Sequence, residues 1–150
     1  MKYSIESKFT FEYGHILKNA YTTACSENLH GHSGKLFIKI TTERIGKNGM
    51  VIDFKELKDN LKKYIDTIDH TFFVAYDDER LNSITAASKS VFIIKGLDEF
   101  DNNPTAECIA AGIYKSIQSY LPISLGLINK DFKLEVRLYE TENNSVVITE

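Results

Sequence analysis

The sequence has little of several residue types that mark whole classes of protein. Its 150 residues include two cysteines, two prolines and no tryptophan. Two cysteines are too few for a disulfide scaffold and indicate a reducing compartment, so we expect a cytoplasmic protein. No apolar run approaches the roughly 18 residues that a membrane-spanning helix needs. Residues 1–12 alternate between polar and apolar side chains, a pattern that argues against a secretory signal.

An excess of charge of one sign is also missing. The 18 lysines and arginines nearly balance the 21 aspartates and glutamates, for a net charge of −3. Such a chain lacks the broad positive surface of a general nucleic-acid binder. The hydrophobic share of 43% and the charged share of 26% are typical of a soluble globular protein. The length suits one domain, and we predict a single domain over residues 1–150.

Alternating hydrophobicity predicts the strands. Side chains alternate at period two over residues 3–13, 30–45 and 131–140, which is the pattern of half-buried strands. Short apolar runs at 91–94 and 146–148 predict two further strands.

Two segments have a helical period instead. The first begins after Asp53, a plausible N-cap with Glu56 three residues later as a capping box requires. The second is predicted to start with Asn103 as its cap and Pro104 in its first turn, and to end at Pro122.

The order of these elements predicts the fold class. Two strands precede the helices, one short strand lies between the helices, and two strands follow. Residues 16–29 are interpreted as irregular and residues 69–90 as a polar connection. Strands at both ends of the chain around two helices indicate an α+β domain, with an antiparallel sheet covered on one face by the helices.

Three of the four histidines fall where strands would bring them together. His30 and His32 flank one glycine on a predicted strand, so their side chains point to the same face. His15 continues the inward register of the first strand, and antiparallel pairing would place it near the other two. Three neutral imidazoles and one open position are the ligand set of a catalytic zinc site. The alternative is a set of unrelated surface or core histidines, because the His-X-His motif is short.

Cys25 precedes this histidine pair and permits two interpretations. A nearby dication depresses a thiol pKa from about 8.5, which makes Cys25 a candidate general base beside an open metal site. As a fourth ligand it would instead close the site and make it structural. Glu27 is a second candidate base. Cys108, on the buried side of the second helix, is interpreted as a small core residue.

Carboxylates complete the candidate set. Asp69 directly precedes His70, and a carboxylate beside a histidine fixes the tautomer of the ring and supports its protonated form. A solvated loop pair is the alternative. Glu140 continues the inward register of the strand over 131–140, and a buried carboxylate needs a partner. A ligand with two adjacent N–H donors would satisfy it, unless the sheet ends earlier and leaves Glu140 exposed.

Taken in chain order, these residues resemble the 6-pyruvoyl-tetrahydropterin synthase and 6-carboxy-tetrahydropterin synthase family. The resemblance spans residues 15–141, and its specificity comes from the order of several short motifs. The matching residues are His15, Cys25, His30-Gly31-His32, Gly49-Met50-Val51-Ile52-Asp53-Phe54, Asp69-His70, Pro104-Thr105-Ala106-Glu107 and Glu140-Thr141.

The resemblance implies a fold, an assembly and a set of residue roles. The fold would be the tunnelling fold, in which ββααββ protomers form a closed ring around a β-barrel, as trimers or hexamers with active sites at subunit interfaces. Cys25 would remove a proton from the substrate side chain, and Asp69 and His70 would move protons on its other side. Glu140 would anchor the pterin ring. The implied zinc ligands are His15, His30 and His32, and the implied residues near the pterin pocket are Thr105 and Glu107.

The resemblance also implies the activity. The expected enzyme is a zinc-dependent lyase that converts 7,8-dihydroneopterin triphosphate to 6-carboxy-5,6,7,8-tetrahydropterin with loss of triphosphate, in queuosine-type deazapurine synthesis. A 6-pyruvoyl-tetrahydropterin synthase is one alternative. Glu27 matches a glutamate of a divergent branch that forms 6-hydroxymethyl-7,8-dihydropterin, a folate precursor, so the product stays open. The last alternative is a non-catalytic zinc- or pterin-binding protein with Cys25 as fourth ligand.

Overall fold

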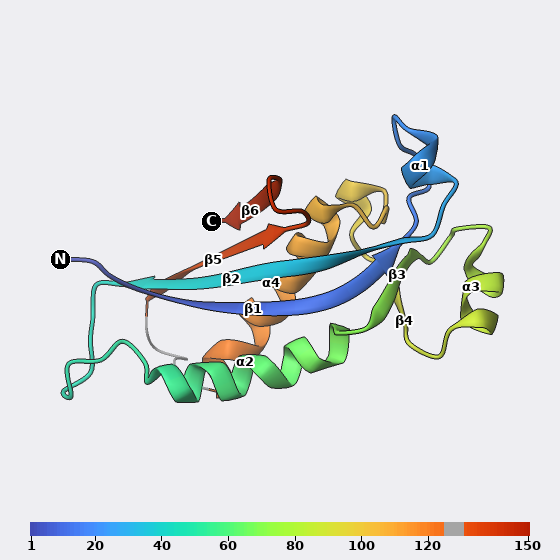
Figure 1. Ribbon diagram of the computed structural model, residues 1–150. Helices are drawn as coiled ribbons and strands as arrows, with labels where there is room; N and C mark the ends of the chain where they lie inside the picture. Colours follow the sequence, from blue (N-terminus) through green and yellow to red (C-terminus); the bar gives the residue numbers. More distant parts are fainter. Residues whose placement is uncertain (125–130) are drawn as a thin grey trace.

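The computed structural model describes residues 1–124 and 131–150, and its centre is a curved sheet of long strands (Figure 1). Helices α2 and α4 cover one face of this sheet, and the shorter α1 and α3 lie near one end of it (Figure 1). The elements in chain order are β1 Tyr3–His15, α1 Thr23–Ser26, β2 His30–Thr42, α2 Phe54–Ile68, β3 Thr71–Ala75, α3 Leu81–Ala87, β4 Val91–Ile94, a 3₁₀ turn at Asp98–Phe100, α4 Ala106–Ser124, β5 Phe132–Tyr139 and β6 Ser145–Thr149.

The sheet has six strands in the order β4-β3-β1-β2-β5-β6. β1 and β2 pair antiparallel over their whole length, and β5 and β6 continue the antiparallel part. At the other edge, β3 pairs with β1 and β4 pairs with β3, both in the parallel sense. The predicted α+β class with two helices on one face is confirmed, but the expectation of a wholly antiparallel sheet is wrong at this edge.

The alternation of the strands explains how the sheet acquires a core. One face of β2 and β5 carries buried aliphatic side chains, while the opposite face is mainly polar and charged, with one aromatic pair, Phe37 and Tyr139. The buried faces of α2 and α4 pack against the aliphatic side. The core residues that these four elements contribute include Leu36, Ile38, Ile40, Leu57, Leu61, Ile65, Ile109, Ile113, Ile117, Leu134, Val136 and Leu138.

The prediction of a polar connection over residues 69–90 is wrong, because this segment contains both β3 and α3. The sequence of β3, Thr-Phe-Phe-Val-Ala, does not alternate, and four of its five residues are buried. Parallel strands that are covered on both faces have continuous apolar runs, so period two is absent. Helix α3 buries only Ile84, and one apolar residue cannot produce a helical stripe.

The ends of the second helix also differ from the prediction. The hydroxyl of Thr105, rather than the side chain of Asn103, accepts a hydrogen bond from the first turn, at 3.2 Å from the Cys108 nitrogen. The Asn103 side chain instead forms hydrogen bonds with the backbone of Lys18 and Asn19. Pro122 lies inside the last turn of α4 and does not end it. A proline lacks the N–H that would donate to the residue four positions earlier, so this part of α4 has one backbone hydrogen bond fewer.

The start of the first helix agrees with the prediction. One Asp53 oxygen accepts hydrogen bonds from the backbone nitrogens of Lys55 and Glu56, at 2.8 and 3.2 Å. Phe54, the first residue of α2, is 55% exposed. Among the described residues, no helix is both long and apolar enough to cross a membrane.

Candidate functional site

The three predicted metal ligands meet at one end of the long β1–β2 pair. The register places His15 directly opposite His30, and His32 follows two residues later on the same face. The Nε2 atom of His15 lies 2.8 Å from Nε2 of His30 and 3.1 Å from Nε2 of His32. One ligand nitrogen from each ring lies within 4.8 Å of the other two, so the group has the dimensions of a metal site.

Hydrogen bonds on the far side of two rings fix their tautomers. Nδ1 of His15 lies 2.7 Å from the backbone oxygen of Pro104, and Nδ1 of His30 lies 3.0 Å from that of Asn28. Carbonyl oxygens only accept, so both Nδ1 atoms carry the proton and both Nε2 atoms present lone pairs. Two lone pairs 2.8 Å apart repel each other unless a cation lies between them. The donor set therefore fits a metal ion, and the carbonyls act as the outer partners that orient ligand imidazoles.

Burial favours the neutral form of two of these rings, those of His15 and His32. His15 is buried, and burial is the main reason that its pKa falls to about 4. The pKa of His32 is also lowered, again chiefly by burial. A neutral imidazole is the form that binds a metal.

Glu140 faces the same group from the end of β5. Its Oε1 atom lies 3.8 Å from Nε2 of His15 and 3.7 Å from Nε2 of His32. The side chain is 27% exposed, so the predicted inward direction is correct although burial is incomplete. The structure thus places a carboxylate beside His15 and His32, whereas the sequence predicted that Glu140 meets a ligand with two N–H donors.

Two cavities lie beside the group and contain some of the other candidate residues, whereas Cys25, Glu27 and Asp69 line neither of them. The first, of about 260 Å³, is lined by all three predicted pterin-binding residues, Thr105, Glu107 and Glu140. The second, of about 590 Å³, contains His30 and His32 in its wall. The same wall includes His70 and Glu12.

The Asp69–His70 pair is built into the junction of α2, β3 and β1. Asp69 accepts a hydrogen bond from the Glu12 backbone nitrogen at 2.8 Å, and its other oxygen lies 3.0 Å from Nδ1 of His70. The Glu12 nitrogen and then the imidazole hold the pKa of Asp69 below its usual value. His70 has a φ of 56°, which is uncommon for a residue with a side chain. Its backbone nitrogen donates to the Glu12 oxygen at 2.7 Å, which fixes this conformation.

Cys25 and Glu27 lie apart from the histidine group. Cys25 belongs to the four-residue helix α1, and Glu27 caps the end of that helix. Within the part of the chain that the structure describes, neither residue belongs to the set of ligand atoms that surrounds the metal position. The structure therefore does not form the closed site with Cys25 as fourth ligand. Cys108 is buried in the core, as expected, and burial raises its pKa to about 11.

Several residues around the site were not identified from the sequence. Asn103 accepts a hydrogen bond from the Lys18 nitrogen at 2.9 Å and donates one to the Asn19 oxygen at 3.2 Å. Arg80 and the buried Asp78 form an ion pair, with 2.7 Å between Nη2 and Oδ2. The partners of Asn103 are more than eighty residues away in the sequence, and the neighbouring Asp78 and Arg80 follow no periodic pattern, so no local signal identified these contacts.

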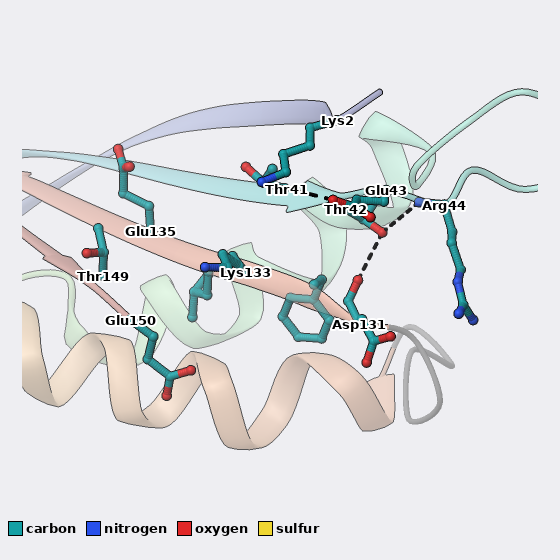
Figure 2. A pocket seen from close by; sticks show the side chains of 12 residues that line it. Lys2, Thr41, Thr42, Glu43, Arg44, Asp131, Lys133, Glu135, Thr149 and Glu150 are labelled. Carbon is teal, nitrogen blue, oxygen red and sulfur yellow. Dashed lines mark hydrogen bonds and ion pairs between the residues drawn. The ribbon is translucent and has the colours of Figure 1, made fainter.

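A cavity of about 530 Å³ lies at the opposite end of β1 and β2 from the histidines (Figure 2). There the Thr42 hydroxyl donates to the Asp131 oxygen at 3.0 Å and accepts from the Arg44 nitrogen at 3.1 Å (Figure 2). Thr42 is the last residue of β2, so the strand is shorter than the predicted strand, which extended to residue 45. The wall of the cavity mixes lysine with glutamate side chains, for example Lys2 4.0 Å from Glu43. None of the predicted site residues lines it.

Comparisons with known proteins agree with this geometry. The family model described as 6-pyruvoyl tetrahydropterin synthase matches residues 4–150. A protein of Rickettsia conorii named 6-carboxy-5,6,7,8-tetrahydropterin synthase is 35% identical over 118 residues, 77% of this chain and 78% of the relative. One with the same name from Aquifex aeolicus is 28% identical over 155 residues, 94% of each chain.

A solved structure shares the fold. It is a Plasmodium vivax 6-pyruvoyltetrahydropterin synthase in which a glutamate, described as a catalytic residue, is replaced by alanine. Its TM-score is 0.72 at 17% identity, over 100% of this chain and 98% of that one. Since the family model covers almost the whole sequence, the chain belongs to the 6-pyruvoyl tetrahydropterin synthase family.

Proposed function

We propose that this protein is a zinc-dependent lyase that converts 7,8-dihydroneopterin triphosphate to 6-carboxy-5,6,7,8-tetrahydropterin with loss of triphosphate. The observation that carries the proposal is the convergence of three imidazole nitrogens, two of them on rings whose outer hydrogen bonds orient them for metal binding. The names of the relatives from Rickettsia conorii and Aquifex aeolicus favour this product. Such an enzyme supplies queuosine-type deazapurine synthesis, which takes place in the cytoplasm.

The chain's residues divide the chemistry among them. His15, His30 and His32 would hold zinc, which when bound polarises the substrate side chain and makes its C–H protons more acidic. Cys25 acts as the base that removes a proton from that side chain. The Asp69–His70 pair exchanges protons at the other side, because the carboxylate supports the protonated imidazole.

The smaller cavity is the proposed place of the pterin ring. Glu140 lies in its wall, and a carboxylate accepts two parallel hydrogen bonds from adjacent ring N–H groups. Thr105 and Glu107 line the same cavity from the start of α4. Its volume, about 260 Å³, is slightly below the roughly 300–1,000 Å³ of typical small-molecule sites.

The substrate's triphosphate favours an oligomer. Among the described residues, neither a lysine nor an arginine lines the two cavities beside the histidines. A triphosphate needs cationic partners. We therefore propose that the active site is completed by a neighbouring copy of the chain, in a trimer or a hexamer.

The test is a product assay with purified, zinc-loaded protein. Dihydroneopterin triphosphate is added, and products are identified by mass spectrometry, while bound zinc is counted by elemental analysis. We expect consumption of substrate, with 6-carboxy-tetrahydropterin as the main product and loss of both zinc and activity in His15→Ala. An absence of turnover by fully zinc-loaded protein contradicts the proposal. A 6-pyruvoyl product would identify the alternative synthase.

A second candidate function uses Glu27 as the base and forms 6-hydroxymethyl-7,8-dihydropterin. It is favoured by the Plasmodium vivax synthase, in which a glutamate is described as a catalytic residue, and by the position of Glu27 directly after α1. The variants Cys25→Ala and Glu27→Ala distinguish the two functions. If Glu27 is the base, its removal abolishes the hydroxymethyl product, whereas an unchanged product profile in Glu27→Ala eliminates this candidate.

A non-catalytic zinc- or pterin-binding protein is the remaining alternative. It would use Cys25 to close the metal site, but Cys25 lies outside the histidine group. Cobalt-substituted protein tests this directly, since a thiolate ligand produces a sulfur-to-metal charge-transfer band. We expect no such band in the resting protein.

A further inference from the structure

The segment that carries Cys25 has almost no packing of its own. Helix α1 is four residues long and none of its residues is buried. A helix of one turn is not stable in isolation, because the conformational entropy lost in forming the first turn exceeds the free energy gained from its few hydrogen bonds. Something other than hydrophobic contact must therefore hold Cys25 in place.

The guanidinium of Arg80 joins the two ends of this segment. Its Nη1 donates to the Ser26 oxygen at 2.6 Å, and its Nη2 donates to the Leu17 oxygen at 3.1 Å. Between these two carbonyls, the Cys25 oxygen accepts a hydrogen bond from the Leu17 nitrogen at 3.1 Å. Cys25 is thus held through its own carbonyl and through that of its neighbour.

Asp78 orients the guanidinium for this task. Its Oδ1 accepts from Nε of Arg80 at 2.8 Å, and its Oδ2 accepts from Nη2 at 2.7 Å. The Asp78 side chain is 1% exposed, so it is available to no partner from outside. A planar, bidentate pair leaves the outer N–H groups of an arginine in fixed directions, which the tetrahedral ammonium of a lysine cannot reproduce.

We infer that Arg80 is a positioning residue for Cys25, with Asp78 as the group that orients it. The inference rests on the proposed function only in giving Cys25 the role of base. Arg80 makes no contact with the histidine group in the described structure; it acts by fixing the backbone on both sides of the thiol. Precise placement matters because a displacement of about 1 Å in a reacting group can cost about 100-fold in rate.

The decisive variant is the double substitution Arg80→Met with Asp78→Asn. Removing Arg80 alone would leave a buried, unpaired carboxylate and could unfold the protein, whereas the double variant leaves neither charge. Arg80→Lys is the second variant, because it keeps the charge and loses only the planar geometry. Lys115→Ala is the matched control, since Lys115 forms a 2.7 Å ion pair with Glu99 on an exposed surface.

Two measurements separate positioning from a general structural role. In both variants we expect kcat to fall about 10- to 100-fold while KM and zinc content stay within about threefold, as expected for a misplaced group. We also expect iodoacetamide to alkylate Cys25 several-fold faster, and buried Cys108 at an unchanged slow rate, as followed by peptide mass spectrometry. The Lys115→Ala control should match the parent protein in both.

The outcomes are distinguishable from those of the proposed function. If the parent protein has no lyase activity but the alkylation of Cys25 accelerates in the variants, the proposed function fails and the positioning role stands. If the parent is active and either kcat or the alkylation rate is unchanged in the folded variants, the inference is overturned. Should the double variant fail to fold, Arg80→Lys decides by the same two measurements.

Discussion

Glu140→Gln should weaken metal binding without disturbing the three histidines. The substitution removes one negative charge and retains the size of the side chain. In the structure the carboxylate lies 3.7 and 3.8 Å from two of the three ring nitrogens, so its charge acts directly on a cation held there. The lost free energy of metal binding is therefore mainly electrostatic.

The size of the loss follows from the distance and the exposure. At about 4 Å, two unit charges interact by about 1 kcal/mol in water and about 4 kcal/mol at an effective dielectric constant of 20. The Glu140 side chain is 27% exposed, which favours the lower half of this range, about 1–2 kcal/mol per unit charge. A divalent ion doubles it to about 2–4 kcal/mol, equivalent to about a 30- to 700-fold rise in Kd.

Competition with a chelating dye measures the Kd for zinc in the metal-free protein and its variants. Glu142→Gln is the matched control, because Glu142 lies two residues away, is exposed and pairs with Lys35. We expect it to bind zinc like the parent. If Glu140→Gln also binds zinc within about threefold of the parent, the carboxylate does not act on the metal, and the electrostatic argument is refuted.

Three further predictions concern stability and are checked by urea denaturation. Asp53→Ala should lower the free energy of unfolding by about 1 kcal/mol, since two N–H groups of α2 lose their acceptor; no change would mean that water replaces the cap. Leu61→Ala, in the centre of the core, should cost about 3 kcal/mol, and a cost below 1 would indicate that the core collapses into the cavity. Asp78→Asn should cost about 3 kcal/mol at pH 7, the lower end for a buried pair because Arg80 is partly exposed. Arg80 depresses the pKa of Asp78, so this stability is present above the unfolded pKa of about 3.9 and disappears as pH falls through the folded value. The difference between parent and Asp78→Asn should therefore shrink below about pH 4, and a constant difference would argue against the ion pair.

Amphipathic elements were predictable because each has one solvent-exposed face. β1, β2 and β5 have polar residues on their open face, so period two is visible in the sequence. The approach of His15 to the histidine pair was predicted from it, while the exact register, with His15 opposite His30, comes from the structure. Asp53 was predictable as a cap because the backbone N–H groups that donate to its side chain lie only two and three residues later in the sequence. β3 has no open face and therefore no period, and it was missed.

The residues of the site were easier to predict from the sequence than the contacts that orient them. The histidine group could be predicted because its members lie on adjacent strands joined by a short segment. The carbonyls that orient the rings could not, since Pro104 meets His15 only through the tertiary fold. The same holds for Arg80, whose partners Leu17 and Ser26 lie more than fifty residues away, a separation at which sequence periodicity carries no information.

The pairing of His15 with His30 makes the metal position a check on the folding of the sheet. A slip of one residue between β1 and β2 would move every side chain of the slipped strand to the opposite face. The same slip would both expose the aliphatic core and separate the imidazoles. A metal ion that binds only the converged rings therefore adds its binding free energy to the correct register alone, and so favours faithful assembly of the sheet as well as catalysis.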